Sequence, residues 1–186
     1  MIPTFEPPSA EQTRAWLLHE ISGQSPAHHR RLALRWAGTL DLPTLERALG
    51  ALARRHDALR TTLTRVGGQL TLAVHAEAEV VLDVESVEAL PAAQREAAAF
   101  RRAAQHAARP FDLESAPPWR ALLVREAPGG GLLCLVAHDV ICDGERSLDL
   151  LFRDLFAVYD ALLARRALPP GPSLRPRDLV ARQAEE

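Results

Sequence analysis

The architecture of this chain is set by residues 132–144, which read LLCLVAHDVICDG. An apolar run leads directly into His138 and Asp139, and a helical pattern follows Gly144. Two adjacent ionisable side chains at the end of a buried strand cost free energy and contribute nothing to a core. Charged groups at strand ends, just before a loop and a helix, are typical of functional sites in α/β proteins. We therefore expect this turn to border a functional site.

Residues 138–144, HDVICDG, resemble the HHxxxDG signature of the condensation domains of nonribosomal peptide synthetases, within the chloramphenicol-acetyltransferase-like superfamily. Three further stretches occur in the matching order. Residues 9–18, SAEQTRAWLL, are similar to the opening motif SxAQxRLWxL, and residues 55–63, RHDALRTTL, to RHExLRTxF. Residues 109–123 resemble the segment that leads into the site strand. The likeness extends over roughly residues 7–182 and reaches only the first half of such a domain.

One position departs from the signature, because Asp139 stands where the family has its second histidine. In the family that histidine is credited with acid/base or positioning work on the attacking amine. The resemblance places Asp139 in the catalytic position, facing a substrate channel, and makes His138 a packed, hydrogen-bonded residue. Successive strand side chains point to opposite faces, so His138 cannot replace the missing imidazole without a register slip.

The expected chemical consequence is a loss of proton-transfer capacity. General acid/base help is worth roughly 10²–10⁴-fold in rate. An ordinary carboxylate, with an unperturbed pKa of about 3.9, is a weak base at neutral pH. We therefore expect Asp139 to impair the joining of an acyl thioester to an amine.

The resemblance supplies the other candidate site residues. Asp143 would form a structural ion pair with an arginine, for which Arg60 is the candidate within this chain, and Gly144 would permit the turn into the next helix. The predicted catalytic-motif residues are thus His138, Asp139, Asp143 and Gly144, and the predicted channel or structural residues are Arg60, Ser9, Gln12, Arg14 and Trp16. Ser9 also reads as a helix N-cap.

Hydrophobic periodicity predicts the elements of an α/β two-layer sandwich, a mixed sheet covered by helices. The expected helices are 9–21, 41–56, 91–109 and 145–166, and the expected strands are 31–38, 59–65, 69–75, 80–84, 119–126 and 131–138. The pair His28 and His29 lies among turn residues and is predicted to be a solvated loop. Residues 1–167 are predicted to form one lobe, and residues 168–186 a proline-rich, extended tail toward a second lobe.

Composition narrows the class of partner. The 186 residues carry a formal net charge of −2, with arginines scattered along the chain, which argues against nucleic acid and anionic membranes. A polar, proline-rich start and the absence of a long apolar run predict a cytoplasmic protein. Cys134 and Cys142 lack metal-site spacing and are expected to be buried, apolar-like residues. The resemblance implies no bound cofactor or metal. Its substrates would arrive on the phosphopantetheine arms of peptidyl or acyl carrier proteins.

Three functions follow. The first is the N-terminal lobe of a condensation domain, impaired by Asp139 in forming amides. The second is a non-catalytic module that binds carrier proteins or neighbouring synthetase domains. The third is a small free-standing acyltransferase whose copies complete one another's sites as a homo-oligomer, because single-lobe acetyltransferases of this superfamily are trimers.

Overall fold

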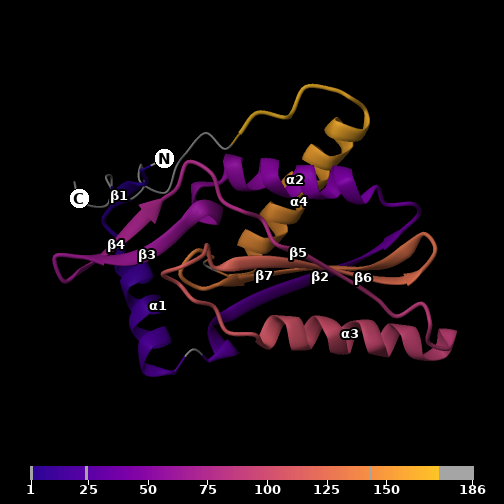
Figure 1. Cartoon of the computed structure of the whole chain (residues 1–186), viewed down its shortest axis with the longest axis horizontal. Helices are drawn as coiled ribbons and strands as arrows, with labels where there is room; N and C mark the ends of the chain where they lie inside the picture. The colour runs from indigo at the N-terminus through magenta and orange to yellow at the C-terminus, as the bar shows by residue number, and fades with distance from the viewer. Residues whose placement is uncertain (1, 24, 143, 172–186) are drawn as a thin grey trace.

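The computed structural model describes residues 2–23, 25–142 and 144–171 (Figure 1). The helices are α1 (Ala10–Ile21), α2 (Leu42–Arg55), α3 (Ala92–Ala108) and α4 (Glu145–Leu163), with short 3₁₀ turns η1 (Pro26–His28) and η2 (Asp57–Arg60). The strands are β1 (Thr4–Glu6), β2 (His29–Ala37), β3 (Thr61–Val66), β4 (Gln69–Val74), β5 (Leu82–Ser86), β6 (Trp119–Ala127) and β7 (Gly130–His138). All four predicted helices and six predicted strands are confirmed, with ends shifted by a few residues.

The strands form two sheets. The larger has the order β2-β7-β6-β5 and is antiparallel except for the parallel pair β5 and β6, which makes it mixed, as expected. The smaller has the order β1-β4-β3. The antiparallel hairpins β3–β4 and β6–β7 turn through the glycine-containing segments 66–68 and 128–130.

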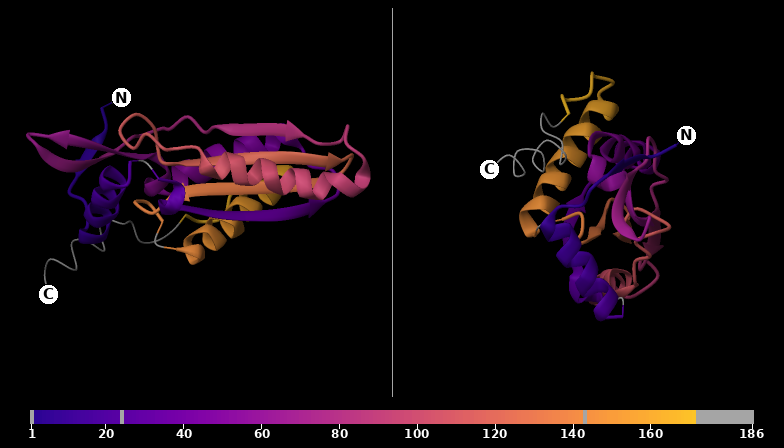
Figure 2. Two further views of the ribbon diagram at one scale, coloured as in Figure 1. Left: turned by 90° about the horizontal axis from the view of Figure 1, so that it is seen from below. Right: turned by 90° about the vertical axis from the view of Figure 1, so that its left-hand side faces the viewer.

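Helices cover both faces of the larger sheet, with α2 and α4 on one face and α3 on the other (Figures 1 and 2). The alternation of β7 divides the core between them. Leu133 and Leu135 pack with α2 and α4, whereas Leu132 and Val136 pack with α3. The α/β class is confirmed. The helices lie in two layers around the larger sheet, because β7 is apolar on both faces.

Local sequence explains how the helices begin. The N–H of Gln12 donates to Ser9 Oγ at 3.2 Å, and the N–H of Ser9 donates to Gln12 Oε1 at 2.9 Å, which forms a capping box. Asp41 Oδ1 accepts the N–H of Thr44 at 2.9 Å at the start of α2. These caps satisfy backbone N–H groups at the starts of α1 and α2.

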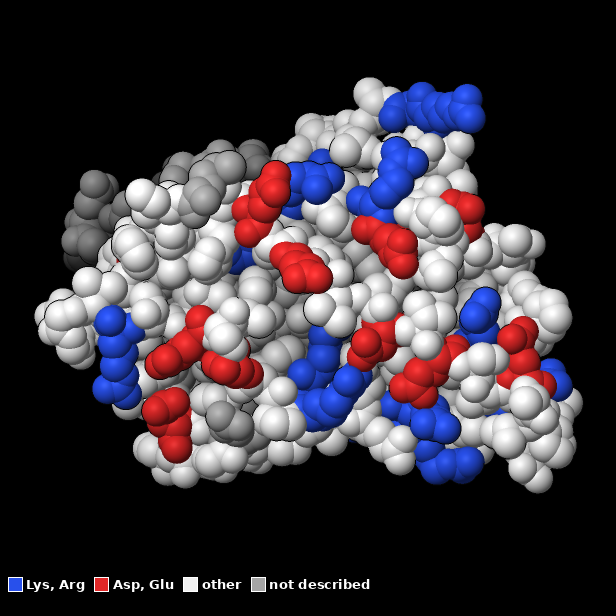
Figure 3. Space-filling view, viewed as in Figure 1, with Lys and Arg blue, Asp and Glu red and all other residues white. Residues whose placement is uncertain are grey.

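The surface agrees with the near-neutral composition. Acidic and basic side chains are interspersed on the face shown in Figure 3. Within the described residues, every helix is too short or too polar to cross a membrane. Cys134 and Cys142 are free thiols and buried, as predicted.

Candidate functional site

The candidate site lies where β7 ends, and His138 is its most deeply buried residue. The side chain is fully buried. Its Nδ1 accepts the N–H of Val140 at 3.1 Å, so the proton lies on Nε2, which faces His19 Nδ1 at 3.2 Å. Burial, together with the nearby His19, His29 and His28, lowers the pKa of His138 to about 3. The imidazole is therefore neutral at physiological pH and is held in the packed, hydrogen-bonded position expected for it.

Three more histidines surround His138. The ring centroids of His19, His29 and His28 lie 4.9, 5.9 and 6.0 Å from that of His138. His29 Nδ1 donates to the Ala107 carbonyl at 2.7 Å. Among the described residues, no group of His, Cys, Asp and Glu is arranged to hold a metal ion. The cluster is therefore a set of packed imidazoles.

The prediction of a solvated loop at His28 and His29 is wrong. His29 is the first residue of β2 and pairs with His138 across the sheet, and both His28 and His29 are half-buried. The turn residues around the pair gave the signal for a loop. The burial comes from α1 and from the end of α3, which the local sequence does not show.

Asp139 lies at the rim of the site, in contact with β2. Arg30 Nε donates to Oδ1 at 2.5 Å and Nη2 donates to Oδ2 at 2.9 Å, a bidentate pair. The Asp139 side chain is 20% exposed and that of Arg30 45%. His28 Nδ1 lies 3.9 Å from Oδ2. The carboxylate therefore sits between a guanidinium and an imidazole, partly open to solvent.

The structure describes some of the remaining motif residues. Asp143 lies outside the described residues, so its predicted pairing with Arg60 stays a prediction. Arg60 donates to the Asp57 carboxylate and to the His75 carbonyl, which ties η2 to the end of β4. Gly144 has φ 137°, a conformation that side chains other than glycine rarely adopt. This explains the glycine before α4.

The residues of the opening motif all belong to α1 or its cap. Ser9 and Gln12 cap the helix. Trp16 is half-buried, with the Arg65 guanidinium 4.8 Å from its ring centroid, and Arg14 is exposed. Their contacts within the described residues are structural. A role for any of them in a substrate channel stays a prediction.

Arg120 supports the site from β6, and sequence reasoning missed it. Its guanidinium lies 4.0 Å from the Phe111 ring centroid and donates to the carbonyls of His106 at 3.2 Å and Pro110 at 3.3 Å. Burial, reinforced by the nearby Arg109, lowers the pKa of Arg120 to about 10. Phe111 in turn contacts the His29 ring at 4.7 Å. The end of α3 is thereby fixed against the histidine cluster.

These contacts define what the site can do. His138 is neutral and closed to solvent, so it is not available to a substrate. His28, Arg30 and Asp139 are ionisable groups at this strand end that are partly open. An imidazole, a guanidinium and a carboxylate are therefore partly exposed together at this strand end.

Comparison with known proteins agrees with this picture. The model of the condensation domain family matches residues 4–185. The chain is 36% identical over 163 residues to a linear gramicidin synthase from Brevibacillus parabrevis, covering 88% of this chain and 3% of that protein. It is 39% identical over 176 residues to a probable non-canonical nonribosomal peptide synthetase, CymA, from Salinispora arenicola, covering 94% of this chain and 2% of that protein. The chain thus spans a small fraction of these relatives.

Solved structures show the same fold. The first condensation domain of the calcium-dependent antibiotic synthetase, in complex with a substrate analogue, superimposes with a TM-score of 0.88 at 22% identity, over 98% of this chain and 43% of that one. The complex of the X-domain and OxyB from teicoplanin biosynthesis gives a TM-score of 0.80 at 32% identity, over 100% of this chain and 39% of that one. The matched residues, the fold and the strand-end motif together show that this chain belongs to the condensation domain family of nonribosomal peptide synthetases, of which it forms the N-terminal lobe.

Proposed function

We propose that this chain forms one wall of the channel in which a condensation domain joins an acyl group to an amine, and that Asp139 slows the reaction here. The observation that carries the proposal is the bidentate pair between Arg30 and Asp139 at the end of β7. The motif's second imidazole would stand at this position. Its replacement is a carboxylate whose charge is already engaged by a guanidinium.

The proposed reaction needs three things from its site. The amine must lose a proton, the thioester carbonyl must gain stabilised negative charge, and the two substrates must meet in the correct orientation. A carboxylate near the carbonyl opposes the developing oxyanion. With aspartate in place of histidine, the channel can still bind and orient the two substrates, but residue 139 can no longer take the proton from the amine. We therefore expect a slow reaction with substrates still bound.

The partners follow from the same proposal. Acyl and aminoacyl groups would be presented as thioesters on the phosphopantetheine arms of carrier proteins, in the cytoplasm. A second lobe or neighbouring synthetase domains would complete the channel. The chain itself would bind no separate cofactor.

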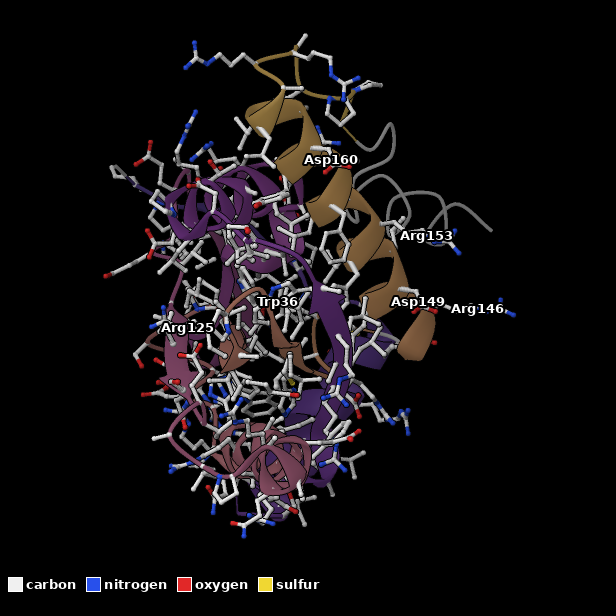
Figure 4. The ribbon with its side chains drawn as sticks, turned by 90° about the vertical axis from the view of Figure 1, so that its right-hand side faces the viewer. Trp36, Arg125, Arg146, Asp149, Arg153 and Asp160 are labelled. Carbon is white, nitrogen blue, oxygen red and sulfur yellow. The ribbon has the colours of Figure 1, made fainter. Side chains whose placement is uncertain are left out.

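Substitution of Asp139 by histidine in a full-length synthetase tests this function. Amide formation between two loaded carrier proteins is measured by mass spectrometry of the product. We expect a gain of roughly 10²-fold or more, because an imidazole at position 139 is a better general base at neutral pH than the carboxylate that it replaces. The matched control is Asp149→His on the outer side of α4, where Asp149 points away from the body of the molecule (Figure 4). No gain in D139H, or an equal gain in both variants, would contradict the proposal.

A second function, a non-catalytic binding module, is favoured by the Arg30–Asp139 pair and by one relative. The X-domain that this chain resembles at 32% identity was solved as a complex with OxyB. A motif carboxylate that is already paired with Arg30 suits a domain that holds a partner without turning over substrate. Binding of a carrier protein or neighbouring domain in calorimetry, with no amide formed by D139H, would favour this module. A stable trimer in sedimentation would instead favour the free-standing acyltransferase.

A further inference from the structure

We propose that His28 supplies the imidazole that the motif lacks at position 139, with Asp139 acting as its positioning residue. This inference rests on the proposed amide-forming function and assigns the proton-transfer step within it. The juxtaposition that carries it is the contact between the His28 ring and the Asp139 carboxylate, made by two segments about a hundred residues apart in the sequence.

The backbone places His28 directly opposite Asp139. His29 pairs with His138 at the end of the β2–β7 ladder. The N–H of Asp139 donates to the carbonyl of His28 at 2.9 Å. A cross-strand neighbour at this spacing keeps its side chain within reach of its partner. A main-chain hydrogen bond therefore holds the two residues side by side.

The side chains meet at ion-pair distance. His28 Nδ1 lies 3.9 Å from Asp139 Oδ2, and Arg30 Nη2 donates to the same oxygen at 2.9 Å. Catalytic hydrogen bonds are often long without substrate and shorten when it binds. A carboxylate that accepts from Nδ1–H leaves the lone pair on Nε2, which is the form of imidazole that can take a proton.

Exposure distinguishes His28 from the other imidazoles. The His28 side chain is 18% exposed and that of Asp139 20%, whereas His138 and His19 are closed off by their neighbours. Among the described residues, the titratable groups that face His28 are Asp139, His19, His29 and His138, and Arg30 is paired with Asp139. Burial comes first among the causes that lower the pKa of His19, His29 and His138, which keeps all three neutral. His29 is half-buried as well, but its Nδ1 donates to the Ala107 carbonyl and its Nε2 is closed to solvent. Of the four rings, His28 is thus the one that a substrate can reach.

The step balances as a proton transfer within aminolysis of a thioester. The amine nitrogen attacks the thioester carbon, a C–N bond forms, and the carbonyl π electrons move to oxygen. His28 Nε2 takes the proton that the nitrogen loses. When the tetrahedral adduct collapses, the C–S bond breaks and the imidazolium returns the proton to the departing sulfur. The products are an amide and the free thiol of the carrier arm, with His28 neutral again.

The test combines substitutions at positions 28 and 139 in the full-length synthetase. His28→Gln is expected to lower the rate of amide formation by roughly 10²-fold. In the D139H background the same change is expected to cost much less, because the imidazole at 139 takes the proton instead. His75→Gln is the matched control, since His75 is half-buried and hydrogen bonded to Thr62 at the end of the smaller sheet. It should leave the rate unchanged.

Two further readouts separate catalysis from folding. In His28→Ala, added imidazole should restore part of the rate, which a purely structural loss would not allow. The limb of the pH–rate profile on which the rate rises with pH should disappear in His28→Gln, and D139N should alter it.

Several outcomes would overturn the inference. Equal losses from His28→Gln in both backgrounds, or full wild-type rate in His28→Gln, would show that His28 carries no proton. A wild-type chain that forms no amide, beside a D139H variant that does, would overturn the role of His28 and leave the proposed function intact. If neither the wild-type chain nor the D139H variant forms an amide, both the role of His28 and the proposed function are wrong.

Discussion

At the scale of single residues, the site depends on imidazoles that stay uncharged. His138 combines full burial with two hydrogen bonds that fix its tautomer, and its pKa is lowered to about 3. His106 on α3 is also buried, and desolvation, followed by the nearby Arg109, lowers its pKa to about 4. An unfolded chain binds protons at these histidines near the ordinary pKa of 6.5. Protonation therefore favours unfolding.

The free energy of unfolding should consequently decrease as the pH falls from about 6.5 toward 3. Each such histidine can contribute a slope of at most about 1.4 kcal/mol per pH unit. In His138→Gln this slope should become shallower, while stability at pH 8 falls because the packed ring is lost. Urea unfolding at several pH values measures both quantities. Parallel pH curves for the variant and the wild type would show that His138 does not titrate on unfolding.

At the scale of elements, patterned segments were predictable and unpatterned ones were not. The leucine spacing of α2 and the alternation of β2 are strong local signals, and both elements occur where they predict them. The three-residue strand β1 carries no alternation, and it exists because Thr4 to Glu6 pair with β4. Partners that are distant in the sequence decide such short strands.

The same contrast holds in the site. Alternation along β7 predicts that His138 and Asp139 point to opposite faces. The Arg30 pair, the His28 contact and the Arg120 support come from β2, η1 and β6. His28 and Arg30 lie outside the recognisable motifs, and nothing local to Arg120 marks it as a support. Tertiary pairing alone brings these residues to the end of β7.

One element-scale contact is close enough to test with matched glycines. A Cβ on Gly131 would lie 2.1 Å from the Val124 carbonyl oxygen and 2.3 Å from Cη2 of the half-buried Trp36, which is labelled in Figure 4. A Cβ on Gly130 would meet the Trp36 carbonyl at an ordinary 3.5 Å. Gly131→Ala is expected to lower the free energy of unfolding by about 1–3 kcal/mol or more, and Gly130→Ala by much less. Denaturant unfolding checks the pair, and similar losses in both would contradict the packing argument.

At the scale of the whole molecule, one ion-pair network joins α2, α4 and the chain that follows α4. Arg55 donates to both Asp154 carboxylate oxygens at 2.7 and 2.8 Å, and His56 Nε2 lies 2.8 Å from Oδ2. Arg55 also donates to the carbonyls of Pro169 at 2.5 Å and Pro170 at 2.7 Å. Burial acts to raise the pKa of Asp154. The hydrogen bonds from Arg55 and His56 outweigh it, so the pKa lies below its ordinary value.

Removing the charge at Asp154 should loosen this junction. Asp154→Asn is expected to cost about 2–4 kcal/mol of unfolding free energy, because Arg55 is left without its counter-charge in a site where both side chains are under 15% exposed. The stabilisation should be present above about pH 4 and be lost as the pH falls through the lowered pKa of Asp154. Asp149→Asn, on the exposed side of the same helix, is the control. Equal melting temperatures for the two variants would show that the network contributes nothing.

The hydrogen bond from the Asp139 amide to the His28 carbonyl has a mechanical consequence. It couples the short 3₁₀ turn before β2 to the loop that precedes α4. A shift of one segment should therefore displace the other. Substitutions between Ser22 and His28, or a neighbouring domain pressing on that turn, would then be transmitted directly to position 139. The position of the motif at 138–144 therefore depends on the position of this turn.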